Sequence, residues 1–309
     1  MPLVSSGQIM LDDLTPGETN TIIAFDVMNV IGLLMTSLVL FPALLSRTVV
    51  RSSAWIALMT SSMFYSSSYL LLLPTGQRSV SQPAYGVCLF QGSLVYSAPV
   101  LVSFAGWAYV LQLYIGLFLF MPKLRLLRVN IMLLLSPVCI AGIMFVASLA
   151  FGIQYPETVV IDSTRRYCHI TSHLPRIMAA VLIGVGTAGM MVFEVILIFL
   201  VSRRWRASKE MNGFNAWHKV GRVIIFTIFP FGAFTLNIAG LYSSGTTNDK
   251  WNLLLPIIPI GTALIFGTRT DIFKAWKTCC SSDTAWNIYE EPKPISHSCP
   301  NCGKISNTV

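Results

Sequence analysis

Charged residues are scarce in this chain, and positive charge is absent from its long apolar segments. Charged residues make up 11% of the 309 residues, whereas hydrophobic residues make up 54%. None of the 21 lysines and arginines lies inside any of the seven long apolar runs. This composition excludes a disordered chain and an ordinary soluble domain, and it is typical of a protein that crosses a membrane several times.

Residues that enzymes use for catalysis are also few or unsuitably placed. The chain has four histidines, none of them in an apolar run, and it has no Gly-rich phosphate loop and no His-Glu-x-x-His motif. We therefore predict no enzymatic activity, no cofactor and no closed metal site. The net charge of +8 lies mostly in short loops, where it favours contact with anionic lipid over nucleic acid.

The seven apolar runs have the length that membrane-spanning helices need. A hydrocarbon core about 30 Å thick requires about 20 apolar residues in helical form, because lipid offers no partner to bare backbone polar groups. We therefore predict an all-α bundle of seven transmembrane helices within residues 21–268. The predicted spans are Thr21–Leu45, Ala54–Leu73, Val87–Phe118, Val129–Ile153, Ile177–Val201, Val223–Tyr242 and Trp251–Thr268.

Small residues in two of these spans have a predictable role. The second span, the least apolar, carries five serines between positions 61 and 68. We expect them to bond to their own helix or to face a neighbouring helix, with a hydrated cavity as the alternative. The fifth span contains Gly184, Gly186 and Gly189, and small residues at this spacing predict close packing against another helix.

The distribution of basic residues predicts the orientation of the chain. Loops on the cytoplasmic side of membrane proteins carry an excess of lysine and arginine. The first, third and fifth loops together hold eleven basic residues, whereas the opposite side holds five. We therefore predict an extracellular N-terminal segment at residues 1–20 and a cytoplasmic C-terminal tail.

The cysteines divide between the two sides of the predicted bundle. Cys88 opens the third span at its outer end, and Cys168 lies in the second outer loop. They are the only cysteines on the oxidising side, while Cys139 is a single buried thiol in the fourth span. A disulfide between Cys88 and Cys168 would typically contribute about 2–4 kcal/mol. Two free thiols at this surface are the alternative.

Three stretches of sequence carry a resemblance to a known family. They are Cys88-Leu-Phe-Gln-Gly-Ser-Leu-Val-Tyr-Ser-Ala-Pro99, Arg166-Tyr-Cys168-His169 and Ile265-Phe-Gly-Thr-Arg-Thr-Asp271. With seven spans and a cysteine at the outer end of the third, the chain resembles G-protein-coupled receptors. The three stretches resemble uncharacterised seven-transmembrane receptors of mushroom-forming fungi. This resemblance implies an extracellular ligand and coupling to a heterotrimeric G protein.

The chain also departs from the rhodopsin-like receptors at three characteristic places. Its third span ends without an acidic-Arg-Tyr triplet, and its seventh span lacks Asn-Pro-x-x-Tyr. Of the Cys-Trp-x-Pro motif in the sixth span only Pro230 is present. The switch residues of rhodopsin-like receptors therefore do not transfer to this chain, and G-protein coupling is an inference from the architecture.

Only two ionisable side chains lie within the predicted spans, Asp26 and Glu194. A charge near the bilayer centre costs at least about 2.5–3.5 kcal/mol, so each needs a partner, water or a proton. Asp26 shares a helix face with Asn29, and this pair is either interfacial or forms the rim of a ligand cavity. Glu194 either reaches the headgroups or a nearby arginine, or pairs with Arg222 and holds the fifth and sixth helices together.

Further candidate residues lie at the two ends of the bundle. In the outer half, Gln91 and Asn237 are the strongest ligand-cavity candidates, because an amide at that depth needs a partner. Tyr96 and Trp251 are weaker candidates for the same cavity. At the inner end, Pro230 either allows the sixth helix to pivot or gives a kink that suits packing. The basic residues there either maintain orientation or receive an acidic helix of a G protein; they are Arg203, Arg204, Arg206, Lys219 and Arg222.

The C-terminal part of the chain has two predicted segments. Residues 269–280 form a short amphipathic helix on the membrane surface, ending in Cys279 and Cys280 at a depth suited to palmitoylation. Residues 281–309 form a polar, disordered cytoplasmic tail. The tail contains Cys299 and Cys302, but a closed zinc site needs four ligands, so this one pair is weak evidence for metal binding.

The sequence as a whole favours an orphan receptor of the G-protein-coupled type. We expect a multi-pass protein of the plasma membrane that transmits an unknown extracellular signal to a heterotrimeric G protein. The alternative is a seven-helix solute transporter, which would place charged or polar pairs near the middle of the membrane. The absence of basic residues from the spans argues against that alternative.

Overall fold

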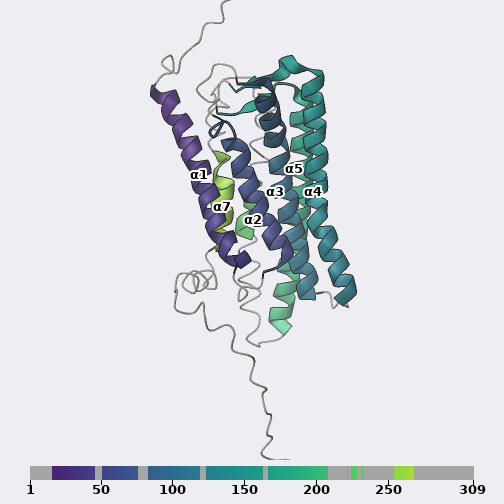
Figure 1. Ribbon diagram of the computed structural model, residues 1–309. Coiled ribbons are helices and arrows are strands. Elements are labelled where there is room, and N and C mark those ends of the chain that lie inside the picture. Colours follow the sequence, from purple (N-terminus) through teal and green to yellow (C-terminus); the bar gives the residue numbers. More distant parts are fainter. Residues whose placement is uncertain are drawn as a thin grey trace, which may run out of the picture.

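The computed structural model describes residues 16–45, 51–75, 83–118, 123–162, 166–207 and 254–267, with short pieces of 221–235. Six long or apolar helices are bounded within these residues (Figure 1). They are α1 (Pro16–Leu45), α2 (Ser53–Leu70), α3 (Tyr85–Phe118), α4 (Lys123–Gln154), α5 (His173–Ala207) and α7 (Ile257–Gly267).

Four of the described helices are long and apolar enough to cross a membrane. They contain the spans Thr19–Leu45, Tyr85–Phe118, Arg128–Gln154 and His173–Arg203. These agree closely with the first, third, fourth and fifth predicted spans. The serine-rich α2 is not among the four, and the described part of α7 is shorter. The sixth predicted span is described only in short pieces, including a helical stretch at 224–228, so the count of seven stays a prediction.

Helix α3 lies at the centre of the described bundle. It contacts α2, α4 and α5, while α1 packs against α2 and α7 (Figure 1). The small residues of α5 make its approach to α3 possible. A Cβ atom at Gly186 would lie 2.8 Å from the hydroxyl of Ser103, and one at Gly189 would lie 2.7 Å from the ring of Trp107. The packing role predicted for these glycines is confirmed.

The serines of α2 mostly bond to their own helix, as the sequence suggested. The hydroxyls of Ser61 and Ser62 donate to the carbonyl of Leu58, and that of Ser68 donates to the carbonyl of Tyr65. These bonds satisfy polar groups that would otherwise be costly in an apolar interior. Ser66 differs, because its buried hydroxyl has no partner among the described residues.

The exterior of the described bundle is strongly apolar, which suits contact with lipid. On α1, α4 and α5, residues such as Leu34, Ile143, Val195 and Phe199 are about half exposed or more. Cys139 lies on the same kind of surface, since its side chain is exposed on α4. The prediction of a single thiol in the fourth span is confirmed, but the prediction that it is buried within the protein is wrong.

The prediction of an all-α fold needs one correction, because the segment between α4 and α5 forms a hairpin. A single 3-10 turn, η2 (Pro156–Thr158), leads into strand β1 (Val159–Ile161). This strand pairs antiparallel with β2 (Cys168–Ile170), with Val160 opposite His169. The run of β-branched residues in β1 favours an extended backbone, and it is the local signal for the strand.

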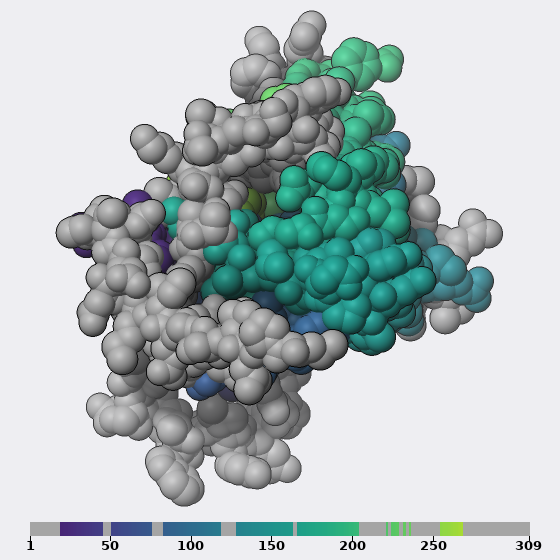
Figure 2. Space-filling view, turned by 90° about the horizontal axis from the view of Figure 1, so that it is seen from above, coloured from purple at the N-terminus to yellow at the C-terminus, as the bar shows by residue number. Residues whose placement is uncertain are grey.

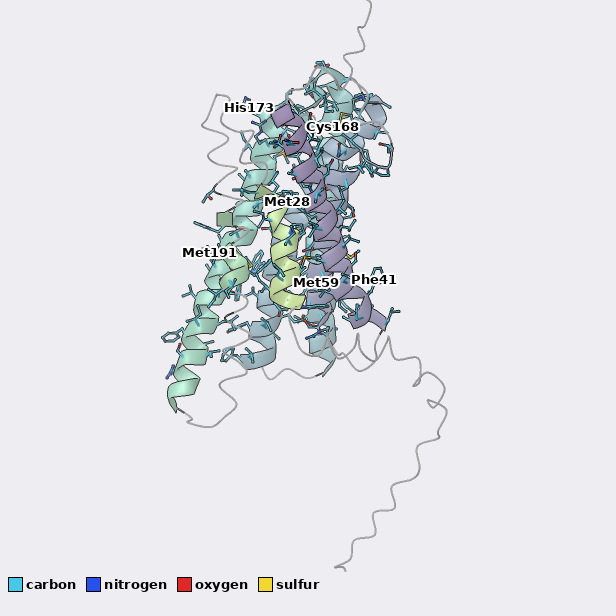
Figure 3. The ribbon with its side chains drawn as sticks, turned by 90° about the vertical axis from the view of Figure 1, so that its left-hand side faces the viewer. Met28, Phe41, Met59, Cys168, His173 and Met191 are labelled. Atoms are coloured by element: carbon cyan, nitrogen blue, oxygen red, sulfur yellow. A yellow bond between two sulfur atoms is a disulfide. The ribbon has the colours of Figure 1, made fainter. Side chains whose placement is uncertain are left out.

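The hairpin lies at one end of the bundle, which we call the Cys88 end. Figure 3 shows Cys168 and His173 at this end, with Phe41 and Met59 nearer the other. We call the other end, where α5 extends beyond its neighbours, the Arg203 end (Figure 1). In the view onto the Cys88 end, teal residues from the α4–α5 half form a continuous surface, with purple residues of α1 at the opposite edge (Figure 2).

Candidate functional site at the Cys88 end

A disulfide joins the hairpin to the first turn of α3. Cys88 and Cys168 are bonded, with their Cα atoms 5.2 Å apart. Both residues are buried beside Leu72, Val159 and Ile161, so the bond is surrounded by apolar side chains. The predicted pairing is confirmed, and the alternative of two free thiols is wrong. Because the bond links positions 80 residues apart in the sequence, it holds the hairpin over the central helix.

Gln91 reinforces this attachment one turn below the disulfide. Its side chain is fully buried, and its amide nitrogen donates to the carbonyls of Ser68 and Tyr69 on α2, each at 3.2 Å. Its amide oxygen accepts from the backbone N–H of Cys168 at 3.0 Å. From the sequence, Gln91 was expected to line a ligand cavity, because a buried amide needs hydrogen-bond partners. The structure supplies those partners from α2 and the hairpin, so both amide donors are used.

Tyr96 makes a second polar contact with the hairpin. Its hydroxyl donates to the carbonyl of Ile170 at 2.9 Å and also interacts with Arg176 at the start of α5. The two candidates from α3, Gln91 and Tyr96, therefore both hold β2. Through the disulfide and these two side chains, the hairpin is fixed to α3 at three successive levels.

Four aromatic rings from three segments meet beneath the hairpin, and we call them the Phe25 cluster. Phe25 lies on α1, Tyr65 and Tyr69 lie on α2, and Tyr167 immediately precedes β2. Ring centroids are 5.7 Å apart for Phe25 and Tyr69, 5.1 Å for Tyr65 and Tyr69, and 5.5 Å for Tyr69 and Tyr167. The hydroxyl of Tyr65 donates to the carbonyl of Leu255, which connects the cluster to the segment before α7.

A cation from the hairpin segment is inserted against this cluster. The guanidinium carbon of Arg166 lies 5.9 Å from the ring centroid of Phe25, and Arg166 is only 2% exposed. A buried cation over an aromatic face gains about 2 kcal/mol or more from the ring quadrupole. The segment Arg166–Tyr167 therefore fills the space among α1, α2 and α3 at the Cys88 end.

Two titratable groups of the hairpin region are shifted by burial. Burial raises the pKa of the Tyr167 hydroxyl well above its ordinary value, so this group stays neutral. Burial lowers the pKa of His169, an effect that Arg176 reinforces and Asp162 opposes. The ring nitrogen Nδ1 of His169 is buried and has no hydrogen-bond partner among the described residues. A neutral imidazole is therefore favoured under the hairpin.

Asn29 occupies a deeper position than its predicted place at a cavity rim. Its side chain is fully buried on α1, where its amide nitrogen donates to the carbonyl of Phe25 at 3.0 Å. Its amide oxygen has no hydrogen-bond partner in the described part of the chain. Asp26, on the adjoining face of the same turn, is half-buried. The predicted pair thus consists of one half-buried carboxylate and one interior amide.

At the Arg203 end, Glu194 contacts the helical stretch 224–228. Glu194 is 6% exposed, and its carboxylate accepts a hydrogen bond from the hydroxyl of Thr227. This bond joins α5 to the segment predicted as the sixth helix, as expected, but through a threonine. The predicted partner Arg222 lies outside the described residues, as do Lys219 and Pro230. Its pairing with Glu194 therefore stays a prediction.

A shallow apolar groove follows α5 at this same end. It has a volume of about 630 Å³ and is lined by Val195, Ile198, Phe199, Ser202 and Arg203. The side chains of Arg204 and Arg206 are not described, although α5 itself continues through both positions. The remaining predicted site residues fall outside the described part of the chain; they are Asn237, Trp251, Cys279 and Cys280.

Sequence reasoning missed the residues that fill the centre of the Cys88 end. Arg166 was counted among five basic residues on the poorly basic side and quoted in the stretch Arg166–His169, but it was given no place in the fold. Phe25 was read as part of an apolar run. One signal was available, because Arg166 lies two residues before the cysteine expected to bond to α3. A side chain so close to that anchor must lie over the helix ends.

No known family model matches this chain, and no curated protein is significantly similar to it.

Proposed function

We propose that this protein is an orphan receptor of the G-protein-coupled type in the plasma membrane. The observation that carries the proposal is the hairpin between α4 and α5, bonded through Cys168 to the first turn of α3. Disulfides form in oxidising compartments, so this bond supports an extracellular Cys88 end. The basic Arg203 end then faces the cytoplasm, in agreement with the distribution of lysine and arginine.

The contact between Glu194 and Thr227 supplies the proposed switch. A receptor needs an element with two arrangements, one of which an extracellular ligand favours. The hydrogen bond from Thr227 to Glu194 holds α5 against the helical stretch 224–228 near the Arg203 end. Breaking it lets the two helices separate and admits a G-protein helix. Arg203, Arg204 and Arg206 at the end of α5 then attract the acidic end of that helix.

Nucleotide exchange on purified heterotrimeric G proteins tests this proposal directly. The protein is reconstituted in lipid nanodiscs, and basal exchange is measured with heterotrimers of each Gα class. A hydrogen bond to a charged group contributes about 1.5–3 kcal/mol, so Thr227→Val and Glu194→Gln should raise basal exchange by about tenfold or more. Ser202→Ala is the matched control, because that hydroxyl bonds within α5, to the carbonyl of Ile198.

Charge reversal at the end of α5 tests the coupling surface. The double variant Arg204→Glu/Arg206→Glu should abolish exchange while insertion and surface expression stay normal. Unchanged exchange in this variant and in Thr227→Val, with correct insertion verified, would refute coupling to a G protein. Saturable uptake of a labelled solute into vesicles, with no exchange on any heterotrimer, would favour the transporter alternative.

A further inference from the structure

Arg166 occupies the Phe25 cluster in the way that a bound cation would. Its guanidinium lies over the ring of Phe25, and the Tyr167 centroid lies 6.2 Å from that same ring. Tyr69 completes the group at 5.7 Å from Phe25. Aromatic groups that surround a cation are a recurrent solution for recognising organic cations, because each ring face carries partial negative charge. The cation here belongs to the chain itself.

Beneath these rings lie two buried polar atoms that no described residue satisfies. Asn29 is one helical turn below Phe25, and its amide oxygen has no hydrogen-bond partner. The hydroxyl of Ser66 on α2 is equally without a described partner, and both residues are fully buried. A Cβ atom at Gly32, one turn below Asn29, would lie 3.2 Å from the hydroxyl oxygen of Ser66. The hydroxyl of Ser66 therefore faces α1 one turn beyond Asn29, whose side chain is buried on the same helix.

Buried oxygens without partners are costly, because they lose their hydrogen bonds to water and gain none in the protein. The cost is removed when a ligand brings N–H donors to the oxygens. Oxygen acceptors below and aromatic faces above are complementary to a cation that carries N–H groups. Guanidinium and primary ammonium groups have this combination, whereas a carboxylate, a phosphate or a plain hydrocarbon does not.

We propose that the Phe25 cluster is the binding site for an organic cation with N–H donors, and that Arg166 is a tethered plug which such a ligand displaces. The tether is short, because Arg166 precedes the disulfide-bonded Cys168 by two residues and therefore stays close to the site after displacement. The binding itself is independent of the proposed receptor function. Only the statement that this cation is the extracellular signal rests on that function.

Removing the plug and supplying its head group in solution tests the proposal. Arg166→Ala leaves a guanidinium-sized space against Phe25. In nanodiscs, methylguanidinium at low millimolar concentration should raise the unfolding temperature of this variant saturably, by about 2–4 °C at ten times its dissociation constant. N-methylurea has nearly the same shape without the charge, and it should give no shift. Wild-type protein, with its plug in place, should respond much less.

Two further variants show whether the effect belongs to this site. Arg51→Ala is the matched control, because Arg51 also lies over a ring, 5.3 Å from the centroid of Trp55 at the Arg203 end. Methylguanidinium should not shift its unfolding temperature. Phe25→Leu added to Arg166→Ala removes the ring but keeps apolar volume, and it should weaken the methylguanidinium effect at least tenfold in concentration. If Arg166→Ala does not fold, Arg166→Lys keeps a cation on a smaller plug and should show the same shift at higher concentration.

The possible results separate binding from signalling. Equal shifts with methylguanidinium and N-methylurea would overturn the proposal, as would equal shifts in the Arg51 variant or no shift in either Arg166 variant. Arg166 would then be a permanent structural contact. A specific shift without any change in nucleotide exchange would support the cation site and count against the receptor function. Failure of exchange on every heterotrimer does not affect the binding measurement, because no G protein takes part in it.

Discussion

The two ends of the bundle are held together by different means. At the Cys88 end, a disulfide and a fully buried amide hold the hairpin on α3, and four packed rings connect its segment to α1 and α2. At the Arg203 end, α5 extends past its neighbours. Its described contacts with the stretch 224–228 are one hydrogen bond and the packing of Phe226 in a core cluster that includes Leu197 and Val201. An end closed by a covalent bond and an end with no described covalent bond suit a protein in which ligand contact is local at the first and the larger movement occurs at the second.

Breaking the disulfide should give the largest loss of stability. The bond closes a segment of 80 residues, so Cys88→Ser/Cys168→Ser should lower stability by about 2–4 kcal/mol. This corresponds to a fall of roughly 5–15 °C in unfolding temperature in nanodiscs. Cys139→Ser is the control, because that thiol is free and exposed on α4. A double variant as stable as the control would mean that packing alone holds the hairpin.

A comparison of two glutamines should sharpen the contrast between the ends. Gln91 is fully buried and joins α2, α3 and the hairpin, so Gln91→Leu leaves an N–H and two carbonyls unpaired and should cost at least about 2 kcal/mol. Gln112 is its counterpart at the Arg203 end, where its side chain bonds to Ala54, Ser53 and Asn130. Gln112 is only half-buried.

Because water can replace the contacts of Gln112, Gln112→Leu should cost only about 1 kcal/mol. Thermal unfolding of both variants in the same nanodiscs gives the comparison. Equal losses would show that the two ends are secured to the same degree, which would remove the basis for assigning movement to the Arg203 end.

The smallest predicted effect is a dependence of stability on pH at the hairpin. Burial holds the pKa of His169 below its ordinary value of about 6.5. The unfolded chain therefore binds the proton more readily, so the contribution of His169 is present above about pH 6.5 and is lost as the pH falls through this value. Asp162 and Arg176 face this imidazole and act in opposite directions on it.

His169→Gln should accordingly flatten the fall in unfolding temperature between pH 7 and about pH 5. His173→Gln is the matched control, since it removes an exposed histidine at the same end. A profile that flattens equally in both variants would assign the pH dependence to solvent-exposed groups.

The sequence alone determined the membrane helices and the covalent bond at the Cys88 end. Four spans were predicted to within a few residues, because helix length and apolarity are local properties that the bilayer thickness fixes. The pairing of Cys88 with Cys168 followed from which loops lie on the same side. The weakest prediction was α2, since its serines lower the apolar signal although they bond inside the helix.

Only the tertiary structure decided which side chains meet between the helices. Gln91 was expected to contact a ligand and instead bonds to α2 and the hairpin, and Glu194 was expected near an arginine and bonds to Thr227. Arg166 and Phe25 are 141 positions apart in the sequence, and no local pattern relates them. Such contacts depend on the rotation of each helix about its axis and on its depth. Both are set by the packing of neighbouring helices, whereas hydropathy and charge specify only that a helix crosses the membrane and in which direction.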